Sequence, residues 1–196
     1  RLGVDQAAQA ALALPLDRPR QARPDLCGAE QAFELPAAVV TRLRELALAH
    51  GATLNMVMLA AYAVLLYRYT GQPDIRIGVP VADRQRSETE PLIGCFVNTQ
   101  VTRIELMPRE SFAALLDRVR DQAAADHERQ ALPFDLLVEA LQPERSLSQA
   151  PLFSVTFDHR VDGASAQVAL AGLHVTPFKI PVTSAKFELS LATTEM

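Results

Sequence analysis

Residues 92–103 read LIGCFVNTQVTR and lead from a charged loop into a β-rich run. Gly94 has no side chain and therefore permits a bulge or a close backbone approach. Phe96 and Val97 then open the β-rich run. The residues alone predict an edge or core strand of a mixed sheet. Asn98 and Gln100 at the start of such a strand are expected to satisfy backbone groups, and contact with a ligand is the alternative.

Composition excludes several classes of protein. A chain of 196 residues that is 49% hydrophobic has enough apolar surface for a core, which excludes a disordered chain. A net charge of -4 with both signs mixed predicts neither nucleic-acid binding nor a membrane surface. Cys27 and Cys95 lie far apart without a CxxC motif, which favours a reducing cytoplasm over a disulfide scaffold. The chain begins at Arg1 without a signal segment, so we expect a cytoplasmic piece of a longer polypeptide.

The first third of the chain is predicted to contain a linker and two helices. Residues 1–30 are rich in Pro and Arg, which is typical of a linker. Periodic apolar residues predict an amphipathic helix between Pro36 and Gly51. Thr53 is predicted to cap an almost wholly apolar helix over residues 54–66, whose whole circumference should be covered by protein. That helix is shorter than the roughly 20 residues that span a bilayer, so no transmembrane segment is expected.

The rest of the chain alternates between strand and helix patterns. Strands are expected at residues 75–81, from residue 96, and at 153–159, 173–175 and 187–191, and helices from Ser111 and from Pro133. Residues 82–91 carry charges and little to bury, which predicts a loop. This order favours an α+β fold with the helices on one side of a mixed sheet.

Motifs of common enzymes are absent from the sequence. It contains no GxGxxG, P-loop, GxSxG or HExxH motif. The histidines are single and scattered, namely His50, His127, His159 and His174. We therefore expect them to be structural or solvated, and we predict no metal site. His127 is the strongest candidate for another role because it ends a long helix, although a His there also favours the helix dipole.

Four stretches of the sequence form a series: residues 51–84 (GATLNMVMLAAYAVLLYRYTGQPDIRIGVPVADR), 93–103 (IGCFVNTQVTR), 129–141 (RQALPFDLLVEAL) and 145–153 (RSLSQAPLF). In order and spacing this series resembles the condensation domains of nonribosomal peptide synthetases, which have a chloramphenicol acetyltransferase-like fold. The second stretch resembles the fifth core motif of that family, and the last two resemble the sixth and seventh. The sixth motif departs from the pattern, because RQALPFD stands where the family has HQDxPFE.

The resemblance implies a single lobe of a two-lobed domain. It predicts an inter-lobe linker at 1–30 and a C-terminal lobe at 31–196, a two-layer sandwich in which helices cover a mixed sheet. A floor loop is expected at about 83–92 and a latch at about 161–183, both with exposed apolar surface. The catalytic His of the family belongs to an HHxxxDG motif in the first lobe. We therefore expect no catalytic residue in this chain and no activity from this chain alone.

The resemblance also implies candidate site residues. Arg84 corresponds to the arginine that pairs with the Asp of HHxxxDG across the lobe junction, so in this lobe alone its guanidinium would be solvated. Gly94, Phe96, Asn98 and Thr99 are implied to lie at the substrate tunnel or the lobe junction. Asn98 and Thr99 would act there as orienters and not as acid or base.

The implied reaction joins a donor thioester to an acceptor amine to form an amide, as in antibiotic or siderophore biosynthesis. Both substrates would be carried on the phosphopantetheine arms of peptidyl carrier proteins, and this chain itself would bind no cofactor. The other implied partners are the first lobe and a neighbouring adenylation domain. Two alternatives stay open. One is a noncatalytic docking module that recruits a carrier protein or a tailoring enzyme, and the other is a carrier-dependent acyltransferase that makes esters.

Overall fold

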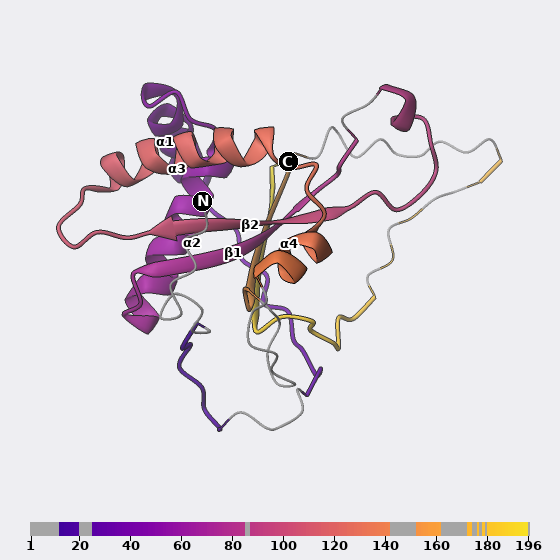
Figure 1. Cartoon of the computed structure of the whole chain (residues 1–196), viewed down its shortest axis with the longest axis horizontal. Coiled ribbons are helices and arrows are strands. Elements are labelled where there is room, and N and C mark those ends of the chain that lie inside the picture. Colours follow the sequence, from indigo (N-terminus) through magenta and orange to yellow (C-terminus); the bar gives the residue numbers. More distant parts are fainter. Residues whose placement is uncertain are drawn as a thin grey trace.

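A four-stranded mixed sheet of order β2-β1-β3-β4 forms the centre of the molecule (Figure 1). The computed structural model describes residues 12–19, 25–84, 87–141, 152–161, 172–173, 176, 178 and 180–195. The strands are β1 Asp74–Val81, β2 Asn98–Glu105, β3 Val155–Val161 and β4 Leu189–Glu195. β2 is antiparallel to β1 over eight residue pairs, whereas β3 is parallel to both β1 and β4. The α+β architecture predicted from the sequence is therefore confirmed.

The described residues form four α-helices and one short 3-10 helix. These are α1 Ala37–Ala49, α2 Leu54–Thr70, α3 Phe112–Glu128, α4 Phe134–Leu141 and the 3-10 helix η2 Ser87–Thr89. α2 begins as predicted, because the Thr53 hydroxyl accepts a hydrogen bond from the Met56 amide. It ends at Gly71, whose φ of 69° lies in the left-handed region that glycine adopts without strain.

The main core lies between the sheet and the helices α2 and α3. Ile75 and Ile77 of β1 point to the same face because side chains alternate along a strand. Both are fully buried there. The cluster continues through Leu59, Tyr62, Leu66, Ile104, Leu115, Val119, Val155 and Phe157. α1 joins this layer through a second cluster, in which Ala47 packs with Val57 and Leu116.

The opposite face of the sheet is covered by aromatic side chains and α4. A Cβ atom on Gly78 would lie 2.3 Å from the ring of Phe153, so only glycine fits beneath that ring. Phe153 in turn contacts Phe134 of α4 at a ring separation of 5.6 Å and Phe187 at 5.4 Å. The expectation that all helices lie on one side of the sheet is therefore wrong, because Phe134 draws α4 to the other side.

Three further expectations differ from the structure. α2 is not covered on its whole circumference, since Leu65 and Tyr69 are 46% and 65% exposed. The strand expected from Phe96 begins at Asn98, and the strand expected at 187–191 is β4. Most of the strand expected at 173–175 lies outside the described residues, as does His174.

The described parts of the N-terminal segment contact the rest of the fold. Leu12 is buried in the main core. Cys27 forms an isolated antiparallel bridge with Ser184. Its amide donates to the Asp25 carboxylate at 2.9 Å, and that carboxylate, through hydrogen bonding and charge, raises the pKa of the Cys27 thiol. Both cysteines are exposed.

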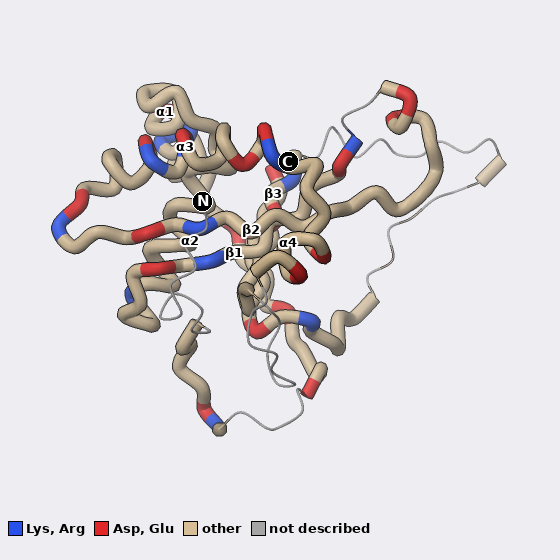
Figure 2. Tube along the Cα trace, viewed as in Figure 1, with Lys and Arg blue, Asp and Glu red and all other residues tan. Residues whose placement is uncertain are grey.

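Charge pattern and helix length bear on whether the described chain could cross a membrane. Basic and acidic residues are interspersed over the elements (Figure 2). No single described helix is long and apolar enough to cross a bilayer. α1 and α2 would pass that test only as a pair, and they are bent by 104° relative to each other.

Candidate functional site

Arg84 holds together the loop between β1 and β2, which projects from the body of the molecule (Figure 1). Its Nη1 donates to the carbonyl oxygens of Thr89, of Glu90 at 3.3 Å and of Leu92 at 2.9 Å. Its Nη2 donates to the Gly94 carbonyl at 3.3 Å. These carbonyls converge on one guanidinium, which therefore fixes the shape of the loop.

An aromatic ring completes the arrangement around Arg84. The guanidinium carbon lies 4.4 Å from the centroid of the Phe96 ring, a distance typical of a cation–π contact. Phe96 is half-buried, and Gly94 lies against the edge of its ring, with a Cβ position 3.3 Å away. The Arg84 guanidinium is thus bound by groups of this chain and only partly exposed, which differs from the expectation of a free, hydrated guanidinium.

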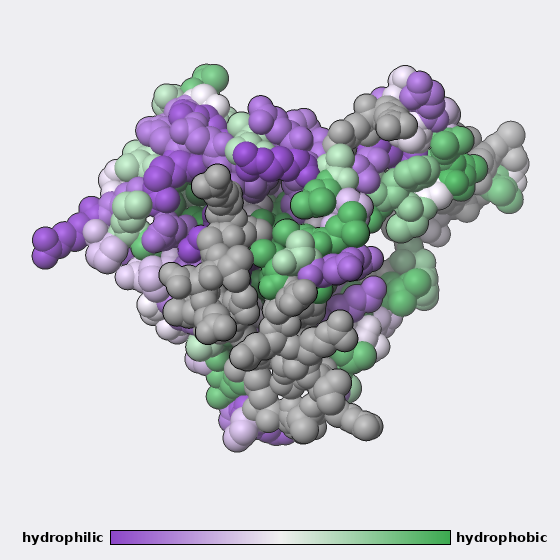
Figure 3. All heavy atoms as spheres, viewed as in Figure 1, coloured by the Kyte–Doolittle hydropathy of each residue, from purple (hydrophilic) through white to green (hydrophobic). Residues whose placement is uncertain are grey.

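The loop that Arg84 organises carries apolar side chains into solvent. Ile93 is fully exposed, and Leu92 and Val97 are 52% and 63% exposed. Figure 3 shows hydrophobic residues gathered on this projecting part of the molecule. Most of the expected latch region lies outside the described residues, but its described large apolar side chains are also exposed, namely Val161, Leu173, Phe178, Ile180 and Val182.

Asn98 joins the first residue of β2 to the turn between α3 and α4. Its Nδ2 donates to the carbonyl oxygens of Gln130 at 3.1 Å and Leu132 at 2.8 Å. Its Oδ1 accepts from the amides of Thr99 at 2.9 Å and Phe134 at 3.1 Å. The amide group thus uses both donors and both acceptor positions. The residue-based expectation that Asn98 satisfies backbone groups is confirmed.

Gln100 and Thr102 continue this seam between β2 and α3. The Gln100 side chain donates to the Asp126 carbonyl at 2.6 Å, and the Thr102 hydroxyl donates to the Asp126 carboxylate at 3.1 Å. Gln122 donates to the other carboxylate oxygen at 2.7 Å. Burial raises the pKa of Asp126, and the hydrogen bonds from Gln122 and Thr102 oppose that shift.

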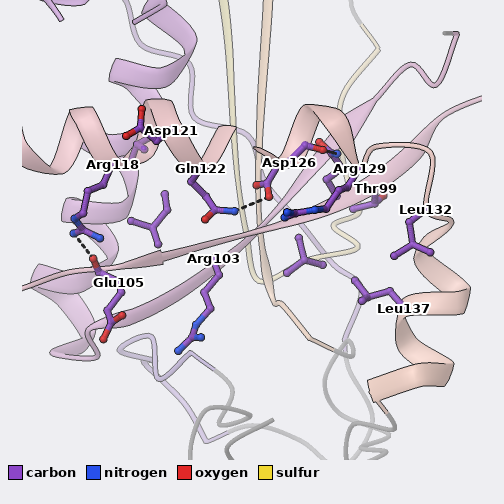
Figure 4. Close-up of a pocket in the computed structure, with 14 residues that line it drawn as sticks. Thr99, Arg103, Glu105, Arg118, Asp121, Gln122, Asp126, Arg129, Leu132 and Leu137 are labelled. Carbon is purple, nitrogen blue, oxygen red and sulfur yellow. Dashed lines mark hydrogen bonds between the residues drawn. The ribbon is translucent and has the colours of Figure 1, made fainter. Parts of the chain in front are cut away.

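A cavity of about 640 Å³ lies beside β2, between α3 and α4 (Figure 4). We call this cavity the β2-edge groove. It is lined by Thr99, Gln100, Val101, Arg103, Ile104 and Glu105 of β2, by Arg118, Val119, Asp121, Gln122 and Asp126 of α3, and by Arg129, Leu132 and Leu137. Thr99 therefore lies in the groove, whereas Arg84, Gly94 and Phe96 lie in the projecting loop. Of the five expected site residues, Thr99 belongs to the described lining of this groove, and the other four do not.

The groove residues of α3 and the following turn were not singled out from the sequence. Their role depends on the contact between α3 and β2, and no local motif marks that contact. The departure from the family's sixth motif was the available signal, because Arg129 and Leu132 of RQALPFD are groove residues.

Two of the described histidines have structural contacts. His50 Nδ1 lies 3.0 Å from Asp117 Oδ1, which links the end of α1 to α3. The ring of His159 has only 7% of its side chain exposed and lies 2.8 Å from the Thr193 hydroxyl and 3.1 Å from Glu195. His127 is exposed in the last turn of α3. Across the part of the chain that the structure describes, no group of three His, Cys, Asp or Glu side chains could hold a metal ion.

Similarity to known proteins agrees with this fold. The Condensation domain family model matches residues 4–196. A linear gramicidin synthase from Brevibacillus parabrevis is 46% identical over 191 residues, which is 96% of this chain and 2% of that protein. The X-domain from teicoplanin biosynthesis has a TM-score of 0.87 and 30% identity over 99% of this chain and 42% of its own. A complex of the X-domain and OxyB from teicoplanin biosynthesis gives a TM-score of 0.82 and 28% identity over 100% of this chain and 41% of that chain.

The fold is thus the one shared by condensation domains and X-domains. Because the family model matches almost the whole chain, this chain belongs to the condensation-domain family. The chain spans about two fifths of the X-domain structures and a small fraction of the synthetase that it matches.

Proposed function

We propose that this chain is the C-terminal lobe of a condensation domain in a nonribosomal peptide synthetase, and that it contributes to amide-bond formation. The observation that carries the proposal is the uninterrupted family match over residues 4–196. The absence of an HHxxxDG motif from the whole sequence supports the assignment to the second lobe.

In the proposed reaction the acceptor amine nitrogen attacks the thioester carbonyl of the donor. A C–N bond forms, the C–S bond breaks, and the thiol of the donor's phosphopantetheine arm leaves. We assign no acid, base or nucleophile to the described part of this chain. Its proposed contribution is to present the Arg84-held loop to the first lobe and to form one wall of the substrate tunnel, with Thr99, Gly94 and Phe96 nearby.

The loop contacts leave room for the proposed cross-lobe role of Arg84. A guanidinium carries five N–H groups; those of Nη1 meet three carbonyls, and Nη2 meets a fourth. Its Nε–H makes no hydrogen bond with the residues that the structure describes. We propose that this side of the guanidinium meets the carboxylate of the first lobe, so that Arg84 shapes the loop and also joins the lobes.

The test is a carrier-to-carrier transfer followed by intact-protein mass spectrometry. The longer polypeptide that contains this chain should move the donor acyl group to the acceptor carrier protein. The 196-residue chain alone should not, because general acid–base catalysis typically contributes 10²–10⁴-fold and its residue is expected in the first lobe. Robust product from this chain alone would overturn the proposal.

A second candidate is a noncatalytic docking module. It is favoured by the likeness to the teicoplanin X-domain, one structure of which is a complex with OxyB, and by RQALPFD in place of HQDxPFE. On this proposal the longer polypeptide forms no amide in the same assay but binds a tailoring enzyme or a carrier protein. Binding is measured by isothermal titration calorimetry with each purified candidate. Amide product from the longer polypeptide would exclude the docking module.

A further inference from the structure

The β2-edge groove follows a sheet edge whose middle is open in the described structure. At its ends the Thr99 amide donates to the Asn98 side chain, and the Glu105 carbonyl accepts from Arg118. β2 ends the strand order and pairs only with β1 among the described strands. Its ladder with β1 is continuous over eight pairs, and its sequence NTQVTRIE contains neither proline nor glycine. Proteins usually protect an edge strand with a bulge, a proline or a covering segment. Here a cavity of about 640 Å³ lies beside the strand instead.

The two ends of the groove differ in charge. At the Asn98 end, Arg129 is exposed, and its guanidinium forms no hydrogen bond or ion pair with the described residues. Its charge acts on Asp126, whose carboxylate is already bound by Gln122 and Thr102. Arg129 is therefore a cation available to an anionic group of a ligand.

The other arginines of the groove are already paired. Arg103 donates through Nε to Asp74 at 2.8 Å. Arg118 binds both carboxylate oxygens of Glu110, at 2.8 and 2.6 Å, and also donates to the Glu105 carbonyl. At this end the Glu105 carboxylate is exposed and accepts no hydrogen bond from the described residues. Arg129 is thus a cation without an ion pair to the described residues at one end of the groove, beside the Asp126 carboxylate. Glu105 is a carboxylate at the other end, where its charge also acts on Arg103 and Arg118.

We propose that the β2-edge groove binds an extended peptide segment of a partner protein, which adds to β2 as a further strand. The segment carries an acidic side chain beside Arg129 and a basic side chain beside Glu105. Strand addition provides main-chain hydrogen bonds, and the flanking pockets select alternate side chains. Leu132 and Leu137 form an apolar wall for the side chain next to the acidic one. This inference is independent of the proposed condensation activity.

The binding test uses a defined probe. It is a fluorescein-labelled peptide of about seven alternating valine and threonine residues, with glutamate at one end and lysine at the other, a length that matches β2. Fluorescence anisotropy with the 196-residue chain should show binding that is about tenfold tighter than for an uncharged version, equivalent to about 1.4 kcal/mol. Methylation of alternate backbone nitrogens on the edge that faces β2 should abolish binding. Hydrogen exchange of the β2 amides should slow when the unmodified probe is added.

Matched variants test whether Arg129 recognises the acidic end of the probe. Arg129→Glu should weaken the charge-separated probe about tenfold and strengthen a probe that has lysine at both ends. Arg42→Glu changes an exposed arginine of α1 outside the groove and should leave both affinities unchanged. Circular dichroism melting of each variant checks that the fold is intact.

Four outcomes would overturn the proposal. The first is binding that is insensitive to backbone methylation, and the second is binding that is equal for charged and uncharged probes. The third is a chain that dimerises and dissociates on Arg129→Glu, which would make a second copy the occupant. The fourth is slow exchange of the β2 amides in the longer polypeptide without any probe, which would make the occupant another segment of that polypeptide.

Discussion

Arg84 shows how one side chain gives a solvent-exposed loop a defined shape. An arginine fork can bridge carbonyls spread over several residues, whereas a lysine ammonium is a compact point charge. A hydrogen bond from a charged donor to a carbonyl contributes about 1.5–3 kcal/mol to stability when it is shielded from water. It contributes less in this half-exposed position.

Replacement of Arg84 by alanine should release the loop. We expect the free energy of unfolding to fall by about 1–2 kcal/mol after the discount for solvent. Amides of residues 89–96, apart from Pro91, should exchange about 5- to 30-fold faster, because about 1.4 kcal/mol corresponds to a factor of ten in an opening equilibrium. Arg84→Lys should recover little of this. Hydrogen exchange read by mass spectrometry is the measurement, with Arg42→Ala as the control. Equal exchange in wild type and Arg84→Ala would show that the loop holds its shape without the guanidinium.

Gly78 is the second residue whose replacement has a specific cost. The added methyl of Gly78→Ala would meet the Phe153 ring, and such overpacking typically costs about 1–3 kcal/mol. The substitution should therefore lower the midpoint of urea unfolding. In a Phe153→Leu background the same change should cost clearly less, because the clashing ring is gone. Additive effects of the two changes would place the cost elsewhere, for example in strand propensity.

At the scale of elements, the seam between β2 and α3 makes stability depend on pH. Burial raises the pKa of Asp126 above its ordinary value near 3.8. An acidic group whose pKa is higher in the folded state than in the unfolded state contributes its full stabilisation only at a pH below its pKa in the unfolded chain. Its contribution is lost as the pH rises from about 4 through the raised folded value, because the unfolded chain loses its proton first.

Asp126→Asn should remove this component of the pH dependence. Relative to wild type, the variant should be more stable at pH 7 than at pH 4, since its side chain stays neutral and still offers an acceptor to Thr102 or Gln122. Urea unfolding of both proteins at the two pH values measures the difference. The carboxylates with lowered pKa, such as Glu110 and Glu195, are present in both proteins and cancel. A wild-type advantage that grows toward pH 7 would contradict the assignment.

The sequence allowed prediction of elements whose signals are local. α2 is an example, because Thr53, the apolar run and Gly71 are all adjacent to it. β1 is another, because Ile75 and Ile77 alternate with polar residues. The partners of Asn98 lie 32, 34 and 36 residues away, so its contacts depend on how α3 and α4 pack. α4 was placed on the wrong face for a similar reason, since Phe134 meets Phe153 only in the folded chain.

The candidate site also contains some features that the sequence could predict and others that it could not. Motif resemblance singled out Arg84, and the structure shows its partners to be loop carbonyls, which carry no sequence signal because every residue has one. The family assignment could be made from the motifs, since it depends on their order along the chain. The β2-edge groove could not, because it combines residues of three elements with the position of β2 at the end of the sheet.

At the scale of the whole molecule, the projecting loop exposes the apolar side chains of Leu92, Ile93 and Val97. Exposed apolar side chains on a soluble domain favour association. The chain alone should therefore self-associate at high concentration, and Ile93→Ser should reduce this without loss of stability, because Ile93 is fully exposed. Multi-angle light scattering over a concentration series is the measurement. Leu48→Ser, at an 83% exposed position on α1, is the control and should have little effect. An equal effect of both changes would mean that association is unspecific.

The same loop has a redox consequence. Cys95 is exposed and lies two residues from Ile93, so we expect copies that associate through the loop to bring their Cys95 thiols together. Cys27 is also exposed, but Asp25 raises its pKa and lowers the fraction of thiolate, the form that attacks in disulfide exchange. Air oxidation at neutral pH should thus cross-link two copies mainly through Cys95. Non-reducing electrophoresis should show a dimer band that Cys95→Ser removes and Cys27→Ser leaves; a dimer that persists in Cys95→Ser would mean that the loops do not meet.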